Sequence, residues 1–146
     1  MKNIKVLLSI ALVLFVTNEA FSQDKVITKD QLPASITKYL NDNFPNNKIL
    51  QATVDNDLFS KDYDVILSDG ISVDFDSKNN VKEISSQTYL PENVIPKKIL
   101  NYVKSNYKAN KIKKYELDDL MQNIELDNGM ELEFTMSGDF YKMEID

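Results

Sequence analysis

The chain contains no cysteine, no histidine, no tryptophan and no arginine, so every basic residue is a lysine. Without cysteine and histidine it cannot form a Ser-His or Cys-His nucleophile pair, a zinc site of the usual nitrogen and sulfur type, or the common haem and iron–sulfur sites. Disulfide bonds are excluded too, so burial of apolar side chains has to stabilise the fold. These absences favour a protein that is not an enzyme, and we expect no cofactor.

Long apolar runs are also scarce, with one exception at the N-terminus. Lys2 and Lys5 precede an apolar run at residues 6–16, which is shorter than the roughly 20 residues of a membrane-spanning helix. Small residues follow at Ala20 and Ser22, as they do before the cleavage site of a secretory signal peptide. We therefore expect residues 1–22 to be a signal peptide, and the mature protein to be periplasmic or secreted, without a permanent membrane anchor.

Removing 22 residues from the 146 leaves 124, which is the usual size of one domain, so we expect a single domain over residues 23–146. This part holds 15 lysines and 22 acidic residues, a formal net charge of −7. An acidic chain is a poor match for the phosphate backbone of nucleic acids. A nucleic-acid partner is therefore disfavoured.

Two segments of the mature chain repeat one pattern. LPASITKYLNDNFPNNKI at residues 32–49 corresponds to IPKKILNYVKSNYKANKI at residues 95–112, 63 positions later. Further along, corresponding residues are 59 positions apart, because the first copy carries four extra residues. We interpret the chain as a tandem duplication, with repeat one at about residues 30–88 and repeat two at about residues 93–146.

Each repeat opens with apolar residues at spacings of 0, 4, 7, 8 and 12, which form one face of an amphipathic helix. They are Leu32, Ile36, Tyr39, Leu40 and Phe44 in the first repeat, and Ile95, Ile99, Tyr102, Val103 and Tyr107 in the second. Pro33 and Pro96 suit the first turn of these helices, and Pro45 ends the first one. The spacing indicates that Tyr39 and Tyr102 are packing residues.

After each helix, apolar and polar residues alternate, as they do in half-buried strands. Three-residue loops at residues 68–70 and 127–129, interpreted as type I turns that end in a left-handed glycine, would pair Val65 with Val73 and Ile124 with Leu132. A turn at residues 137–138 would pair Phe134 with Tyr141. Each repeat then consists of a helix and four antiparallel strands. This predicts an α+β fold, with two helices on one face of an eight-stranded antiparallel sheet in one two-layer domain.

The doubled pattern L/I-P-x-x-I-x-x-Y, then an asparagine with an aromatic residue, Lys-Ile, and Asp/Asn-Gly, resembles the secreted PepSY-like family, also called beta-lactamase-inhibitor-like. The resemblance covers about residues 30–146. It implies a tandem helix-plus-sheet domain similar in architecture to the beta-lactamase inhibitory protein, and a role as a binder or inhibitor. It implies no catalytic residues, because the shared positions are core and turn positions. Lys108 departs from the pattern, since Pro45 holds this position in the first repeat.

The predicted register places mostly acidic residues on the sheet face that carries no helix. They form two rows across three strands each, and we take them as candidate partner-binding residues: Asp64, Asp74 and Glu83 in the first repeat, and Glu125, Glu131 and Glu144 in the second. Like charges that face each other across strands are destabilising by about 0.2 to 1 kcal/mol per pair. A basic protein surface that binds this face would compensate the repulsion.

Two other interpretations of this face stay open. It could be a solvated strand face whose charge is relieved by lysines such as Lys142, predicted opposite Glu133, because antiparallel sheets often leave one face wet. It could also hold a calcium ion, which favours clustered oxygen ligands, although no full calcium-loop motif is present.

A second asymmetry is a basic segment at residues 93–115, which holds seven lysines and no acid: Lys97, Lys98, Lys104, Lys108, Lys111, Lys113 and Lys114. The second helix should therefore have a basic outer face. Such a face could meet anionic lipid or an acidic partner, or it could simply be solvated.

The sequence therefore predicts an exported, non-enzymatic binding or inhibitory module whose acidic sheet face binds a protein in the cell envelope or outside the cell. The alternative is a structural or chaperone-like envelope protein with no inhibitory target. A hydrolase that uses paired carboxylates is disfavoured, because we expect the acids on a flat, wet strand face and not in a cleft that could raise a carboxyl pKa.

Overall fold

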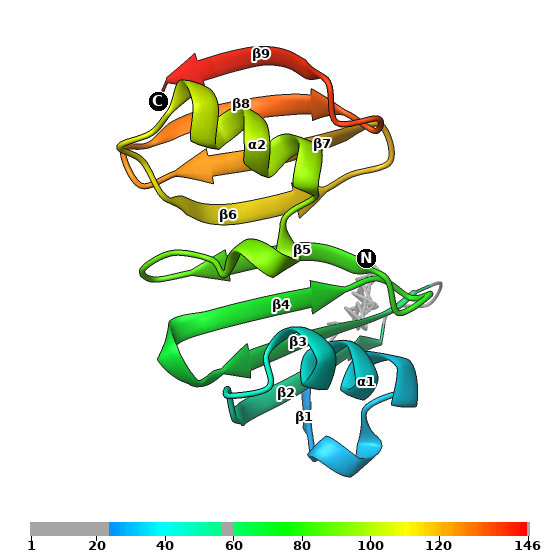
Figure 1. The fold of residues 1–146 in the computed structure, drawn as a ribbon. Coiled ribbons are helices and arrows are strands. Elements are labelled where there is room, and N and C mark those ends of the chain that lie inside the picture. Colours follow the sequence, from blue (N-terminus) through cyan, green and yellow to red (C-terminus); the bar gives the residue numbers. More distant parts are fainter. Residues whose placement is uncertain (1–23, 57–59, 146) are drawn as a thin grey trace, which may run out of the picture.

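The structure is a computed structural model that describes residues 24–56 and 60–145. The predicted signal peptide lies outside the described residues. Figure 1 shows two α-helices packed against a long antiparallel sheet. The elements in chain order are β1 (Lys25–Ile27), the 3-10 helix η1 (Lys29–Gln31), α1 (Ala34–Asn43), β2 (Ile49–Asn56), β3 (Lys61–Leu67), η2 (Ser68–Gly70), β4 (Ile71–Phe75), β5 (Val81–Ser86), η3 (Glu92–Val94), α2 (Lys97–Asn106), β6 (Ile112–Leu117), β7 (Met121–Leu126), β8 (Met130–Thr135) and β9 (Phe140–Ile145).

The strands form one sheet in the order β1 to β9, and every neighbouring pair is antiparallel. The α+β fold class is confirmed, but the sheet has nine strands where the sequence predicted eight. The additional strand is β1, which pairs with β2 through Lys25–Val54, Val26–Thr53 and Ile27–Ala52. Three residues are too few for the alternating pattern that identifies a strand.

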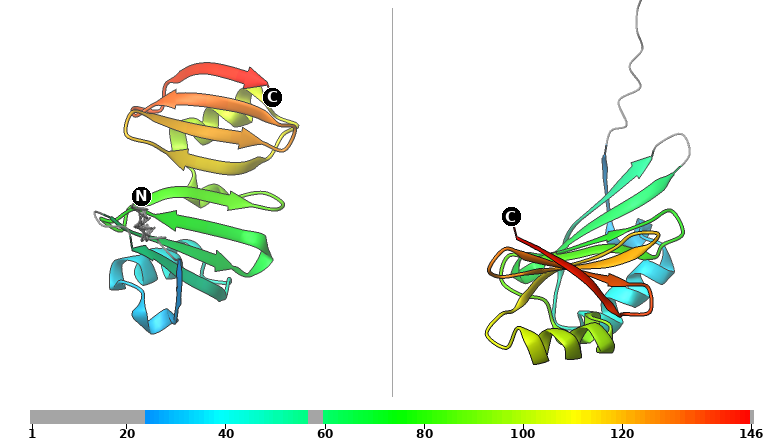
Figure 2. Two further views of the ribbon diagram at one scale, coloured as in Figure 1. Left: turned by 180° about the vertical axis from the view of Figure 1, so that it is seen from behind. Right: turned by 90° about the horizontal axis from the view of Figure 1, so that it is seen from above.

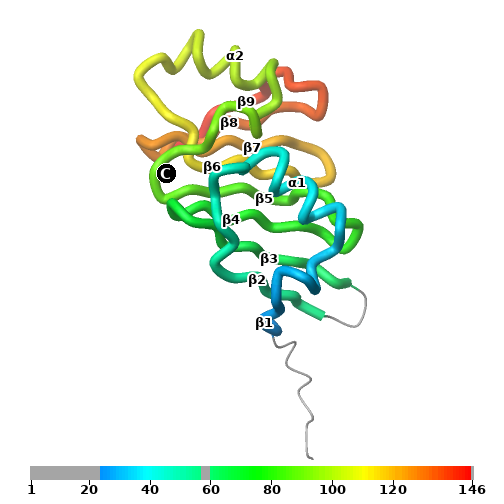
Figure 3. The backbone as a smooth tube through the Cα atoms, turned by 60° about the horizontal axis from the view of Figure 1, so that its bottom comes forward, coloured from blue at the N-terminus to red at the C-terminus, as the bar shows by residue number. Residues whose placement is uncertain are grey.

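Both α-helices lie on the same face of the sheet, as expected, and the described chain places no helix on the other face (Figures 2 and 3). Ile36 and Leu40 of α1 are buried against the sheet, and so are Ile99 and Val103 of α2. They join one continuous hydrophobic core with the inward-facing residues of the strands. Among the described residues, the second face of the sheet is formed by strand side chains without a covering helix.

The two helices end in the same way, because their sequences correspond there. Pro33 and Pro96 were expected in the first turn of the helices. They lie one position earlier, directly before the first helical residue. At the other end, the side-chain amide of Asn43 donates to the backbone carbonyl of Tyr39, and that of Asn106 donates to the carbonyl of Tyr102, both at 2.9 Å. Each bond joins residues four apart in the last turn, so the two asparagines stabilise the ends of the two helices in the same way.

The tyrosines of the repeat are packing residues, as predicted. The ring of Tyr39 meets the ring of Phe75 edge-on at 5.7 Å, and the ring of Tyr102 meets that of Phe134 in the same way at 5.4 Å. Burial, together with the nearby Tyr115, raises the pKa of Tyr39 to about 12.

The predicted register is correct in most of the sheet. Val65 pairs with Val73, and Ile124 pairs with Leu132. Phe134 pairs with Phe140 and not with Tyr141, so this prediction is wrong; a β-bulge inserts one residue in β9 before Lys142 restores the expected pairing with Glu133.

The first three-residue loop also differs from the prediction. Asp69 adopts a left-handed conformation with φ of 63°, in addition to Gly70 with φ of 70°. A type I turn has a negative φ at both central positions, so only the glycine was expected to be left-handed. Aspartate tolerates the left-handed region better than most residues. In the loop at residues 127–129, Gly129 alone is left-handed, as expected.

The two halves of the sheet meet at a short seam between β5 and β6. The pairs that join these strands are Glu83–Glu116, Ile84–Tyr115 and Ser85–Lys114. Within each half, from β2 to β5 and from β6 to β9, at least five residue pairs join every two neighbouring strands. The seam has only the three pairs named above. A hollow of about 680 Å³ lies at one end of the seam, and a pocket of about 240 Å³ lies at the other end, beside α2.

Candidate binding face

The free face of the sheet brings the first group of predicted acids together in a row, here called row one. Asp64 of β3 pairs with Asp74 of β4, and Asp74 pairs with Glu83 of β5. The row continues across the seam, because Glu83 pairs with Glu116 of β6. Glu116 was not among the predicted residues, since nothing in the sequence gives the register between β5 and β6.

The second group of predicted acids forms row two. Glu125 of β7 pairs with Glu131 of β8, and Glu131 pairs with Glu144 of β9. All six candidate residues thus lie in the two rows that the register predicted. Row two begins beside Lys114 of β6, which pairs with Glu125.

Three lysines relieve part of the negative charge. The Lys114 ammonium lies 2.9 Å from the Glu83 carboxylate and 3.2 Å from that of Glu116, so it neutralises charge at the seam. The Lys142 ammonium lies 3.0 Å from Glu133, as predicted, and 2.6 Å from Glu144. Lys82, on the bulged strand β5, bridges to Asp62 at 3.1 Å.

Even so, strands β3 to β9 carry nine acids on this face against these three lysines, which gives a formal charge of −6. The nine acids are Asp62, Asp64, Asp74, Glu83, Glu116, Glu125, Glu131, Glu133 and Glu144.

Four of the nine acids have no lysine within 4.0 Å in the described chain: Asp64 and Asp74 in row one, and Glu125 and Glu131 in row two. Glu125 and Glu131 face each other across β7 and β8, and this pair is the one whose counterpart in the other half of the sheet is uncharged. The residues 59 positions earlier, Ile66 and Ser72, form the equivalent cross-strand pair in the first half of the sheet and carry no charge. The fold therefore does not require two acids at this position.

A narrow hollow of about 70 Å³ lies beside this pair and is lined mainly by hydrogen-bond acceptors. Its lining includes Glu125, Glu131 and Glu133, and also Lys114, which supplies a donor on one side. Asn123 also borders it, and the side-chain oxygen of Asn123 is buried without a donor among the described residues. An unsatisfied buried acceptor is destabilising by about 1 to 3 kcal/mol. A group that only donates hydrogen bonds, such as a lysine ammonium, matches this set of acceptors.

The pKa of Asp74, at the centre of row one, is raised. Burial, reinforced by the neighbouring carboxylates of Asp64 and Glu83, raises the pKa of Asp74 to about 6. Burial also raises the pKa of Asp64, and Asp24 and Asp62 add to this effect. The only hydrogen bond to the Asp74 carboxylate within the described chain is a long one, 3.4 Å from the Ser72 hydroxyl. Like charge and burial thus act together on this aspartate.

The face is not flat throughout, which corrects the expectation from the sequence. The hollow of about 680 Å³ at the seam is bordered by Asp74, Glu83 and Glu116, and by the turns at residues 76–80 and 117–119. In those turns, the Asp76 carboxylate accepts hydrogen bonds from the backbone N–H groups of Lys78 and Asn80.

The acids around this hollow are engaged in the fold in several ways. Glu83 is bound to Lys114, and the Asp118 carboxylate accepts the backbone N–H groups of Leu120 and Met121. Among the described residues, no group of three or more acids, histidines or cysteines is arranged to hold a metal ion.

Comparison with known proteins identifies the family of the chain. Residues 18–60 and 61–142 match the family described as "Putative beta-lactamase-inhibitor-like, PepSY-like". No curated protein matches significantly.

Three crystal structures from Bacteroides are similar over nearly their full length. A "putative periplasmic protein" from Bacteroides vulgatus ATCC 8482 is 33% identical, with a TM-score of 0.76 over 85% of this chain and 98% of the other. A "putative calcium-regulated periplasmic protein" from Bacteroides thetaiotaomicron is 31% identical, with a TM-score of 0.78 over 83% of this chain and 96% of the other. A second Bacteroides vulgatus protein, described as periplasmic and of unknown function, is 32% identical, with a TM-score of 0.77 over 84% of this chain and 99% of the other.

The periplasmic descriptions of these relatives agree with the export expected from the sequence. None of the helices in the described residues is long and apolar enough to span a membrane. The family match and the identities of above 30% support the same assignment, so the resemblance noted in the sequence is confirmed: the chain belongs to the PepSY-like family.

Proposed function

We propose that this protein is an exported, non-enzymatic module that binds a basic protein surface through its acidic sheet face. The supporting observation is the facing pair Glu125 and Glu131, which has no lysine partner and lies beside the acceptor-lined hollow at Asn123. The equivalent pair in the first half of the sheet is uncharged, so the acids are not needed for folding. A lysine or arginine of the partner would supply the missing donors and remove the repulsion within row two.

The test is capture of envelope proteins by residues 23–146, compared with a variant that carries Glu125→Gln and Glu131→Gln. Neither residue takes part in an ion pair of the described chain, so these changes remove charge without breaking one. We expect capture to weaken strongly in the variant, and capture by the wild type to fall as salt is raised.

The control for charge carries Asp30→Asn and Asp42→Asn, which remove the same charge on the helix side of the molecule. Both residues border a shallow hollow at α1 and lie away from the acidic face. Asp42→Asn also removes an exposed ion pair with Lys38, which contributes little to stability. This control should capture as well as the wild type. Equal capture by all three proteins in low salt would refute binding through the acidic face.

The alternative is a structural or chaperone-like envelope protein with no inhibitory target. The capture experiment also separates these functions. One stoichiometric partner supports a binder or inhibitor, whereas many partners at low occupancy support a chaperone-like role.

A second candidate function is calcium-dependent binding. One relative is described as calcium-regulated, and the hollow at the seam is bordered by carboxylates of Asp74, Glu83 and Glu116. No group of three or more acids in the described chain is placed to hold a metal ion, and Lys114 binds both Glu83 and Glu116. Calcium binds six to eight oxygen ligands, so it would have to displace Lys114 and draw further oxygens from the turns around this hollow. Calorimetric titration with calcium should then give saturable binding that Asp74→Asn weakens. Heat of dilution alone would exclude this function.

A further inference from the structure

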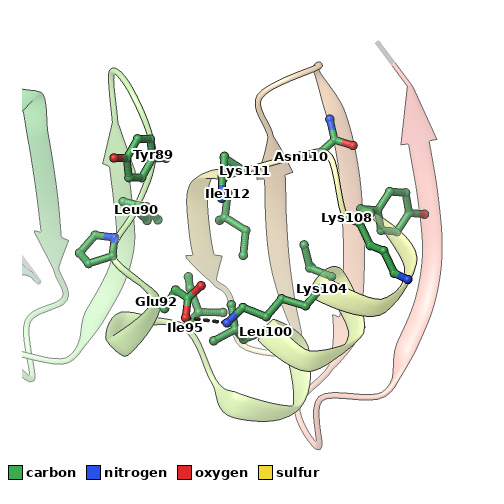
Figure 4. Close-up of a pocket in the computed structure, with 13 residues that line it drawn as sticks. Tyr89, Leu90, Glu92, Ile95, Leu100, Lys104, Lys108, Asn110, Lys111 and Ile112 are labelled. Carbon is green, nitrogen blue, oxygen red and sulfur yellow. Dashed lines mark hydrogen bonds and ion pairs between the residues drawn. The ribbon is translucent and has the colours of Figure 1, made fainter.

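The pocket beside α2 lies on the helix side of the molecule, away from the acidic face. Figure 4 shows it between the chain at residues 89–92 and the C-terminal half of α2. Its floor is apolar and consists of the buried side chains of Leu90, Ile95, Val103 and Ile112, together with the partly buried Leu100. The backbone N–H of Leu90 donates to the carbonyl of Ile112 at 2.7 Å, which fixes the two walls relative to each other.

The rim of the pocket is basic. Lys104, Lys108 and Lys111 line it, with Glu92 as the acid on the same rim. The Lys104 ammonium binds Glu92 at 2.6 Å and spans the space between α2 and the opposite wall (Figure 4). Lys108 and Lys111 have no ion pair within 4.0 Å among the described residues.

Figure 4 shows the Lys108 side chain directed away from Leu90 and Ile112. Hydrogen bonds lower the pKa of Asp127, and Lys111 lies near enough to this carboxylate to add to the effect. Lys108 and Lys111 are both exposed, so rotation about their side-chain bonds can bring positive charge to the mouth of the pocket.

The first repeat shows that the fold does not require three of the apolar and basic side chains that α2 and its C-terminal end contribute to this pocket. The residues 63 positions before Leu100, Lys104 and Lys108 are Thr37, Asn41 and Pro45. Lysines near a helix C-terminus can stabilise the helix by a favourable interaction with its dipole. However, α1 ends without any basic residue in its last turn and caps its end in the same way as α2. Leu100, Lys104 and Lys108 are therefore particular to the second half of the chain, whereas Lys111 and Ile112 correspond to Lys48 and Ile49 in the first half.

We propose that this pocket binds a small apolar molecule that carries a carboxylate. The apolar body would lie on Leu90, Leu100 and Ile112, and the carboxylate would accept hydrogen bonds from Lys108 and Lys111. The volume of about 240 Å³ is below the range of about 300 to 1,000 Å³ that is typical for drug-sized ligands, so the ligand is small. This site is separate from the acidic face, and neither proposal depends on the other.

The test uses decanoate as the probe, below its critical micelle concentration, with residues 23–146 labelled with ¹⁵N. Decanol, which lacks the charge, and decyltrimethylammonium, which reverses it, are the ligand controls. We expect saturable one-to-one binding of decanoate, with amide shifts centred on Leu90, Leu100 and Ile112. Decanol should bind at least about threefold more weakly, and the cation should not bind at this pocket.

Two variants test the two parts of the pocket. Lys108→Gln with Lys111→Gln should weaken decanoate binding by about threefold to tenfold and leave decanol unaffected. Leu100→Thr, which introduces the residue type of the first half, should weaken both ligands by about tenfold.

The matched control for charge is Lys48→Gln with Lys97→Gln, which removes two lysines outside the pocket. Decanoate binding by this control should equal that of the wild type. Far-UV circular dichroism checks that every variant folds. The proposal is overturned if decanoate gives no saturable shifts at 1 mM, if decanol binds equally well, or if the Lys108 and Lys111 variant and its control lose equal affinity.

Discussion

Replacing Asp74 with asparagine should stabilise the protein at neutral pH. Burial and the flanking acids raise the pKa of this group from 3.8 to about 6 in the folded state. One pKa unit corresponds to about 1.36 kcal/mol, so a shift of this size corresponds to about 3 kcal/mol. Because Asp74 is partly exposed, solvent screening reduces this figure. We expect Asp74→Asn to raise the free energy of unfolding at pH 7 by about 1 to 2 kcal/mol.

The pH dependence gives the sign of this effect. At pH 3 the carboxyl group is protonated in both the folded and the unfolded state, so the charge does not affect stability. As the pH rises from about 4 to about 6, the unfolded chain loses the proton first, and the wild-type protein is progressively destabilised. Asp74→Asn removes this loss. The stabilisation by the variant should therefore be near zero at pH 3 and complete above pH 7.

Urea unfolding at pH 3 and pH 7, followed by circular dichroism, measures the effect. Glu131→Gln in row two is the control, and by the cross-strand scale we expect it to change the free energy of unfolding by no more than about 0.2 to 1 kcal/mol. A difference between Asp74→Asn and the wild type that is the same at both pH values would refute the reasoning. So would destabilisation by Asp74→Asn at pH 7.

Further substitutions test other parts of the structure, with urea unfolding as the measurement. Asp76→Ala should lower the free energy of unfolding by about 1 to 2 kcal/mol at pH 7, and by less below pH 4. Burial raises the pKa of Asp76, but the hydrogen bonds of the turn outweigh burial and lower this pKa overall. The stabilisation by the carboxylate is therefore lost as the pH falls. Gln122→Leu should cost about 1 to 3 kcal/mol, because the buried hydroxyl of Tyr115 loses its acceptor at 2.8 Å. Phe75→Leu and Phe134→Leu, at corresponding core positions, should destabilise by similar amounts, below the about 3 to 5 kcal/mol of a phenylalanine-to-alanine change, and each in a single transition. Two separate transitions would refute our proposal that residues 23–146 form one domain.

Local patterns in the sequence were sufficient to predict most of the fold. The spacing of apolar residues predicts both helices, and alternation with turn glycines predicts the register between β3 and β4 and between β7 and β8. The bulge in β9 was not predictable, because Phe140 and Tyr141 are both aromatic and either could face Phe134. Strand β1 was missed because it gains its order from pairing with β2 and not from its own three residues.

The candidate site was predictable to the same extent. Row one and row two follow from pairing within each half of the sheet, which turn lengths determine. Glu116 and the bridging position of Lys114 depend on how β5 meets β6, and a helix and two loops separate these strands. The hollow and the pocket at the two ends of the seam depend on the same tertiary arrangement. Sequence periodicity carries no information on that arrangement.

The short seam between β5 and β6 links the stability of the sheet to the charge of its free face. Glu83 and Glu116 face each other there, and Lys114 contacts both carboxylates. Lys114 is thereby occupied at the seam, so it leaves Glu125, its cross-strand neighbour, without an ion pair in the described chain. A basic partner bound at Glu125 would add positive charge directly beside the seam. Since a partner that binds only the folded state stabilises it by RT ln(1 + [L]/Kd), occupation of the acidic face would raise the free energy of unfolding of the protein.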